Sequence, residues 1–222
     1  MAKETKSTTN PAPKQETALV ELRRLNLGIL QIPIRGVSSL ISHAWSDKAK
    51  AEMLAKQQKK AATKKSDKDP FRDYVESMYW MDGIPAGKVT PKHVAKARFG
   101  FPSVGFKNAG VSAARQLDGI PMTQLRGAFH VRGELTEIET PKPPEVREDM
   151  VRLQGKTADI RYRGEFRDWS ATLEIEYNKD VISPEMLFNL YNVAGFAVGI
   201  GEWRPEKNGQ SGRFEVLMPE AA

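Results

Sequence analysis

The alternation of hydrophobic and polar residues predicts six core elements, in the order strand, helix, strand, strand, helix, strand. Apolar residues at every second position mark the strands, and apolar residues three or four positions apart mark the helices. This order is typical of a ferredoxin-like βαββαβ sheet of the α+β class, with helices on one face and the other face free to bind. The six elements are Leu27–Ile34, Ser103–Leu117, Phe129–Ile138, Ala171–Tyr177, Ser183–Ala194 and Arg213–Met218.

Local signals predict where several elements begin and end. Ser183 is a good N-cap for the second core helix, Pro184 fits its first position, and Gly195 is placed to stop it. Ser46 is likewise an N-cap, from which a helix rich in lysine and alanine is expected to run to about Lys65.

The same patterns indicate the organisation of the chain. Residues 1–18 contain little that a core would bury and are expected to form a disordered tail. Residues 19–222 are expected to form one domain with a four-stranded sheet of the kind that RNA-recognition modules (RRMs) use as a platform, with insertions at 36–101 and 140–165. Asp159–Phe166 alternates in the same way as Ala171–Tyr177, and the two are predicted to pair as a hairpin across a four-residue turn.

Charge is distributed unevenly along this chain of net charge +6. Between Lys48 and Lys65 there are seven lysines and a single acidic residue, Glu52, so this segment alone carries an excess equal to the whole net charge. Such a segregated basic block is the electrostatic signature of a polyanion-binding segment. The alternative is a solvated, lysine-rich helix that keeps the protein soluble.

Several classes of protein are disfavoured by composition. The chain has no cysteine, which excludes disulfides and thiolate-bound metals and fits a reducing cytoplasm. The first 17 residues lack the apolar core of a signal peptide, and no apolar run approaches the length of a membrane span. We therefore expect a cytoplasmic protein without a membrane partner.

Catalytic motifs are sparse. The three histidines, His43, His93 and His130, lie far apart, and the chain has no GxSxG elbow and no Walker lysine motif. We expect no cofactor, no metal and no enzymatic activity. A metal-dependent nuclease that uses Glu148 and Asp149, or Glu174 and Glu176, is the weakest alternative.

A glycine-rich segment between the second core helix and the last strand has the strongest binding chemistry. Glycine lets a backbone approach a ligand closely, and arginine forks beside an aromatic ring suit a phosphodiester strand with stacked bases. The alternative is a glycine-rich turn whose tryptophan folds back on the core while its cations are solvated. The candidate contacts here are Gly199, Gly201, Trp203, Arg204, Lys207 and Arg213.

Further candidate contacts are basic residues outside this segment. In the lysine-rich helix, a phosphate-tracking arm would consist of Lys48, Lys56, Lys59, Lys60, Lys64 and Lys65. Lys107 and Arg115 lie on the first core helix and either bind phosphate or are simply solvated. Arg161 and Arg163 share one face of a strand and either bind phosphate or pair across strands with Glu174 and Glu176.

The glycine-rich segment, together with the element order, resembles the repeat-associated mysterious proteins (RAMPs), in particular the Cas7 backbone subunits of CRISPR effector complexes. In those subunits a glycine-rich loop abuts the nucleic acid and a basic insertion after the first strand grips it. The resemblance implies the same roles here for Gly199–Phe214 and Lys48–Lys65. The chain is shorter than full Cas7 subunits and has no obvious long thumb.

Three short segments are also similar to a widespread, uncharacterised family of bacteriophage and prophage proteins. They are Ser42–Lys50, Phe101–Lys107 and Gly199–Lys207. This similarity implies a phage origin and carries no activity.

Together these features predict a non-catalytic protein that binds single-stranded RNA or DNA and assembles along the strand as a homo-oligomer or filament. Other phage subunits or CRISPR-type subunits are further candidate partners. The alternative is a phage structural or assembly protein that uses the lysine-rich arm and the glycine-rich segment for contacts between subunits.

Overall fold

The computed structural model describes residues 24–59, 68–117, 119, 121–153 and 157–217. The predicted tail at 1–18 and the candidate contacts Lys60, Lys64 and Lys65 lie outside these ranges. Within them, helices alternate with three antiparallel sheets, so the predicted α+β class is confirmed.

The largest sheet has four strands, and its two longest strands lie in the middle. β1 (Leu27–Gly36) pairs on one side with β9 (Ser170–Asn178) and on the other with β10 (Phe214–Val216). β5 (Phe129–Val131) pairs with the outer side of β9, which gives the order β10-β1-β9-β5. All three pairings are antiparallel.

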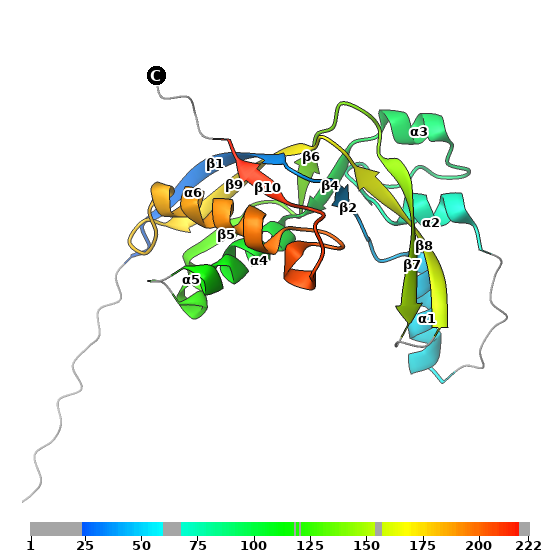
Figure 1. Ribbon diagram of the computed structural model, residues 1–222, viewed down its shortest axis with the longest axis horizontal. Coiled ribbons are helices and arrows are strands. Elements are labelled where there is room, and N and C mark those ends of the chain that lie inside the picture. Colours follow the sequence, from blue (N-terminus) through cyan, green and yellow to red (C-terminus); the bar gives the residue numbers. More distant parts are fainter. Residues whose placement is uncertain (1–23, 60–67, 118, 120, 154–156, 218–222) are drawn as a thin grey trace, which may run out of the picture.

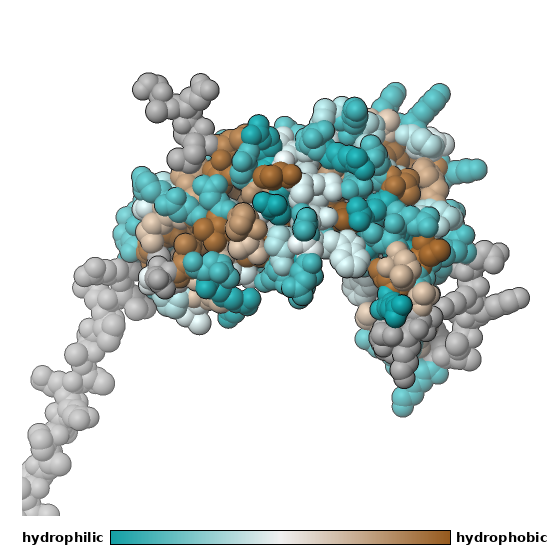
Figure 2. Space-filling view, viewed as in Figure 1, coloured by the Kyte–Doolittle hydropathy of each residue, from teal (hydrophilic) through white to brown (hydrophobic). Residues whose placement is uncertain are grey.

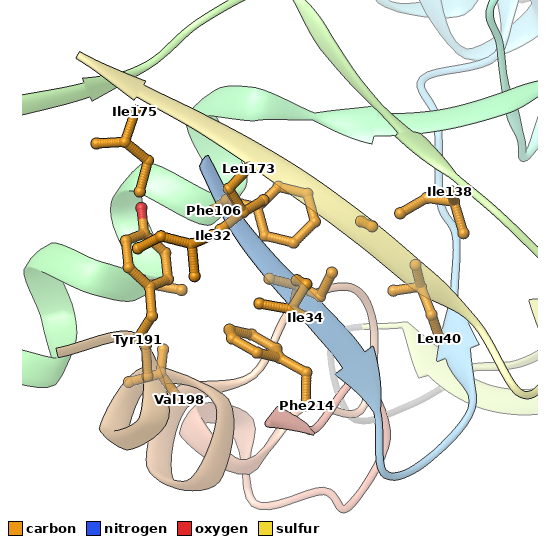
Figure 3. Packing of buried hydrophobic residues seen from close by; sticks show 14 of the residues in the cluster. Ile32, Ile34, Leu40, Phe106, Ile138, Leu173, Ile175, Tyr191, Val198 and Phe214 are labelled. Carbon is orange, nitrogen blue, oxygen red and sulfur yellow. The ribbon is translucent and has the colours of Figure 1, made fainter. Parts of the chain in front are cut away.

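Helices α4 (Ser103–Ala113) and α6 (Pro184–Val193) lie along one face of this sheet (Figure 1). The inward-facing residues of β1 and β9 pack against aromatic side chains of these helices, as the close-up in Figure 3 shows for Ile32, Leu173 and Phe106. The Ser183 hydroxyl caps α6 by accepting a hydrogen bond from the Met186 amide, as its sequence signal predicts.

The opposite face of the sheet is uncovered by these helices but is electrically balanced. Arg35 on β1 pairs with Glu215 at 2.6 Å, and Arg132 pairs with Glu174 on β9. Glu176 also lies on this face, beside exposed Ile29. A face on which acids neutralise the arginines has no excess positive charge with which to attract a polyanion.

The remaining strands form two smaller sheets. β2 (Leu40–Ile41), β8 (Thr157–Phe166) and β7 (Glu145–Leu153) pair in the order β2-β8-β7. β3 (Tyr79–Trp80), β4 (Phe99–Pro102) and β6 (Leu135–Ile138) pair in the order β3-β4-β6.

Short helices complete this part of the molecule, and α1 projects from it beside the β7–β8 hairpin (Figure 1). Their bounds are α1 Asp47–Gln57, α2 Pro70–Glu76, α3 Pro91–Lys96 and, near the four-stranded sheet, α5 Met122–Ala128. Short helical turns are η1 (Ala114–Gln116), η2 (Ala194–Val198, a π-helix) and η3 (Pro205–Lys207).

Two strand predictions are wrong. β8 does not pair with β9. It pairs with β7 in a hairpin of nine- and ten-residue strands, so the predicted insertion at 140–165 contains a long hairpin that its sequence did not indicate. The predicted strand Phe129–Ile138 is two strands in different sheets, because Gly133 takes a φ of +80° and turns the chain between β5 and β6.

Two helix ends also differ from prediction. The helix that Ser46 caps ends at Gln57, and Lys59 takes a φ of +52°, outside the helical region. Gly195 does not stop α6, because the chain continues through η2 and turns at Gly199, whose φ is +68°. Gly195 instead packs against β10, where an added Cβ would lie 1.9 Å from the Phe214 carbonyl oxygen.

Candidate nucleic-acid interface

The segment 199–213, here called the glycine loop, folds closely on itself. Gly199, Gly201 and Gly212 all have positive φ angles, between +67° and +75°. A Cβ on Gly212 would lie 1.7 Å from the Ile200 carbonyl oxygen, and one on Gly209 would lie 1.7 Å from that of Trp203. The close approach that these glycines permit is therefore to the loop's own backbone.

Backbone hydrogen bonds fix the glycine loop to the chain between β1 and β2. The Gly212 amide donates to the Ser39 carbonyl at 2.7 Å, and the Glu202 amide donates to the Ile41 carbonyl at 3.0 Å. A Cβ on Gly201 would lie 2.5 Å from that same Ile41 oxygen. The loop therefore has a defined shape that holds its side chains in place.

The arginine and tryptophan side chains of the loop are oriented by acids. The Arg204 guanidinium donates to Glu206 at 3.0 Å and to the Gly201 carbonyl at 3.1 Å. The Trp203 indole N–H donates to Asp149 on β7 at 3.3 Å, yet 42% of Trp203 remains exposed. Burial raises the pKa of Glu206, but hydrogen bonds from Arg204 and Ser112 outweigh burial and hold that pKa below its usual value.

A cleft of about 380 Å³ separates the glycine loop from the β7–β8 hairpin. We call it the loop cleft, and it is lined by Val151, Arg163, Glu202, Trp203, Arg204 and Lys207. The outline of the molecule is indented between the part with the four-stranded sheet and the part with α1 and the hairpin (Figure 2). Four of the predicted contacts therefore line the loop cleft: Arg163, Trp203, Arg204 and Lys207.

Arg163, at the base of the loop cleft, is buried, with 6% of its side chain exposed. It pairs with Asp149 at 3.1 Å and lies 4.0 Å from Glu202. His43 contacts Glu202 at 2.9 Å, and this hydrogen bond is the main cause that holds the pKa of Glu202 below its usual value. These contacts connect β8, the glycine loop and the segment that precedes α1.

The expected alternative pairing of Arg161 and Arg163 with Glu174 and Glu176 is wrong. Arg161 pairs with Asp159 at 2.8 Å, and Glu174 pairs with Arg132. The reason is that β8 and β9 belong to different sheets, so their side chains do not face each other.

The other predicted contacts are distributed over several surfaces. Arg115 lies 3.7 Å from Glu206 and so borders the glycine loop. Arg213, at the end of that loop, stacks over the ring of Phe196, with its guanidinium carbon 5.4 Å from the ring centroid. Lys107 lies instead beside His130 of β5, at 3.0 Å, and burial lowers its pKa.

The lysine arm is only partly described. Lys48 is half-buried at the start of α1, where it faces β8, and Lys56 and Lys59 are exposed at the far end of the helix. α1 has no buried residue among those the structure describes, which fits the thin apolar stripe of its sequence.

Sequence reasoning missed several residues that shape this region. Asp149, Glu202 and His43 orient Arg163 and Trp203, but an acid or histidine that pairs across distant segments leaves no local pattern. Phe196, whose ring contacts Arg213, was also missed. It is 70% exposed, and the glycine beside it is the only feature of the sequence that could have indicated its position.

Among the residues described, no three histidines or acids come together as a metal site would require. Within the same ranges, none of the helices has the length and hydrophobicity needed to cross a bilayer.

No protein-family model matches the chain, and no curated protein matches it in sequence. Among solved structures, it is similar to Cmr6 from Pyrococcus furiosus, with 10% identity over 87% of this chain and 100% of that one, at a TM-score of 0.42. It is also similar to a chain of a CRISPR RNA-guided surveillance complex, with 10% identity over 84% of this chain and 66% of that one, at a TM-score of 0.33. At these identities and scores, neither likeness bears on what this chain binds.

Proposed function

We propose that the protein binds single-stranded nucleic acid in the loop cleft, without catalysis. The observation that carries the proposal is the lining of this cleft, where exposed Trp203 lies beside Arg204 and Lys207. Cations that contact phosphates and an aromatic ring that stacks on a base are the usual combination for strand binding without sequence readout.

The rigidity of the glycine loop supports this proposal. Because Trp203 and Arg204 are held by Asp149 and Glu206, little side-chain freedom is lost when a strand binds. On the open face of the four-stranded sheet the arginines Arg35 and Arg132 are paired with acids. In the loop cleft the arginines are paired as well, but Lys207 makes no ion pair among the described residues and is available for a phosphate.

We further propose that β1, α4, β5, β9, α6 and β10 form a ferredoxin-like unit of the Cas7 type within a single domain. The strand order and the two helices on one face support this assignment. A phage origin, a cytoplasmic location and assembly along the strand as an oligomer or filament complete the proposal.

The test is fluorescence anisotropy of labelled 30-nucleotide RNA and DNA strands, with the wild type and loop variants. Trp203→Ala is expected to weaken binding by about 5- to 150-fold, the range for one stacked base of about 1–3 kcal/mol. Trp203→Phe keeps a stacking ring but loses the hydrogen bond to Asp149, so it is expected to retain most of the affinity.

Lysine variants provide matched controls. Lys207→Ala is expected to weaken binding, whereas Lys92→Ala, on the exposed face of α3, removes the same charge without touching the loop cleft. An equal loss of affinity in both variants would show that only the net charge of the protein matters for binding. No binding by the wild type at low salt would refute the proposal. Oligomers that form without nucleic acid and ignore added strands would favour the assembly protein instead.

A further inference from the structure

A second cleft, of about 400 Å³, lies between the start of α1 and the edge of β8. Its walls are the N-cap Ser46 with Lys48, Ala49 and Glu52 of α1, Asp73 of α2, and β8 from Ala158 to Arg163. We call it the α1 cleft. Its volume is within the range of small-molecule sites, and Arg163 borders both this cleft and the loop cleft.

The α1 cleft contains a buried arginine with an unused donor. Arg163 is 94% buried by its side-chain exposure of 6%, and its Nε–H has no hydrogen-bond partner among the described residues. Leaving a buried donor of a charged group unpaired costs free energy, so such a donor indicates that a ligand supplies the missing acceptor. Arg161, by contrast, forms an ion pair with Asp159, in which its Nε lies 2.8 Å from the carboxylate.

The first turn of α1 adds a second source of positive potential. Ser46 caps the helix by accepting from the Ala49 amide, and the amides before Ala49 have no partner within the helix. These amides and the helix dipole favour an anion at this end of an 11-residue helix. Lys48 lines the same cleft and makes no ion pair within the part of the chain that the structure describes.

The acids that line the α1 cleft leave this potential only partly neutralised. Asp159 accepts from Lys68 at 2.7 Å and pairs with Arg161, and the hydrogen bond from Lys68 is the main cause that lowers its pKa. Glu52 and Asp73 also line the cleft. Lys48 and the Nε–H of Arg163 remain for a ligand.

An aromatic ring completes the lining. Trp45 precedes the N-cap of α1, lines the cleft and is 57% exposed. Lys50 Nζ lies 5.9 Å from the ring centroid. An exposed indole beside an anion site gives a flat surface for a nucleobase, which an inorganic anion or an aliphatic carboxylate does not need.

We infer that the α1 cleft binds a nucleoside phosphate, with the phosphate at the first turn of α1 beside Lys48 and the base against Trp45. The inference takes nucleic-acid chemistry from the proposed function but uses a different cleft. The nucleoside phosphate is either a free nucleotide or the phosphorylated end of a strand.

Isothermal titration calorimetry of the full chain with adenosine 5′-monophosphate tests this inference, with adenosine as the probe without phosphate. The monophosphate is expected to bind at least tenfold more tightly than adenosine. Lys48→Ala and Trp45→Ala are each expected to weaken its binding about tenfold. Lys56→Ala removes the same charge from the same helix outside the cleft and is expected to have no effect.

Two outcomes would overturn the inference: no heat of binding with the monophosphate, or equal losses for Lys48→Ala and Lys56→Ala. Competition by a tetranucleotide with a 5′-phosphate, but not by its 5′-hydroxyl form, would identify a strand end as the ligand. Absence of competition by both would identify the free nucleotide. Lys207→Ala serves to separate the two sites, because it impairs strand binding in the loop cleft and leaves the monophosphate assay unchanged.

Discussion

At the scale of single residues, the glycine loop shows how one observation in the sequence acquires a different meaning in the structure. In the sequence, its glycines indicate that a backbone and a ligand approach each other closely. In the structure, the close approach is within the loop backbone itself, between Gly212 and Ile200 and between Gly209 and Trp203. The loop is therefore shaped by folding, and its side chains are ready for a ligand beforehand.

This role predicts the stability of a glycine variant. Gly212→Ala is expected to destabilise the protein by about 4 kcal/mol or more, because a positive φ is combined with a backbone clash at 1.7 Å. Gly83→Ala is the matched control: its φ is +76°, but an added Cβ meets nothing within 4 Å, so only about 1–2 kcal/mol is expected. Urea denaturation of both variants measures the difference, and equal losses would contradict the clash.

The side chains at the loop cleft were only partly predictable. Trp203, Arg204 and Lys207 are close in sequence, so a local pattern was enough to group them. Arg163 joins them from β8, and its acidic partner Asp149 comes from β7, which only the tertiary structure brings together. Pairings of this kind depend on which strands share a sheet.

At the scale of elements, the predicted hairpin shows why strand periodicity does not determine pairing. β8 and β9 both alternate, and the three residues that connect them would suit a hairpin. The chain instead turns a corner at Trp169, which is fully buried and donates its indole N–H to the Ser38 carbonyl at 2.8 Å. Beyond this corner, β9 lies in the four-stranded sheet beside β1, whereas β8 pairs with β7. The starts of the helices after Ser46 and Ser183 were predicted correctly, because N-caps are local signals.

α1 supports a prediction about salt dependence. If its exposed lysines contact phosphates, Lys56→Gln with Lys59→Gln is expected to reduce the slope of log K against log salt by about 1.4 for a single strand. The double variant Lys92→Gln with Lys96→Gln removes two exposed lysines from α3 and is expected to leave the slope unchanged. Anisotropy titrations from low to high salt measure both slopes, and equal changes would show that α1 contributes only net charge.

At the scale of the whole molecule, ion pairs connect the part with the four-stranded sheet to the part with α1 and the hairpin. Glu202 is central among them, since it contacts His43 before α1 and faces Arg163 of β8. Glu165 of β8 accepts a hydrogen bond at 2.6 Å from Ser39, in the chain that follows β1. Burial raises the pKa of Glu165, but the contacts with Ser39 and with Arg147 and Arg167 outweigh burial and hold that pKa below its usual value.

These lowered pKa values predict how stability depends on pH. A carboxyl group whose pKa in the folded state lies below the usual 4.5 stabilises the fold above pH 4.5, and loses that contribution as pH falls through the folded pKa. The melting temperature is therefore expected to fall from about pH 4.5 downward. Glu202→Gln is expected to melt lower than the wild type at pH 7 and to show a shallower fall below pH 4.5.

Melting curves between pH 3 and pH 7 measure both effects. Glu134→Gln is a suitable control, since that side chain is exposed and makes none of the contacts of Glu202. Parallel pH profiles for the wild type and Glu202→Gln would contradict the assigned role of the His43–Glu202 contact.

The position of β10 has a consequence for how the protein is made. Its residues Phe214–Val216 lie beside Ile34–Gly36 of β1, which are about 180 positions earlier in the chain. A ribosome adds residues from the amino end, so Ile34–Gly36 of β1 have no partner on this side until Phe214–Val216 have been synthesised. Translation halted before that point would release a chain whose central strand lacks a neighbour, and a sheet edge of that kind is a template for aggregation.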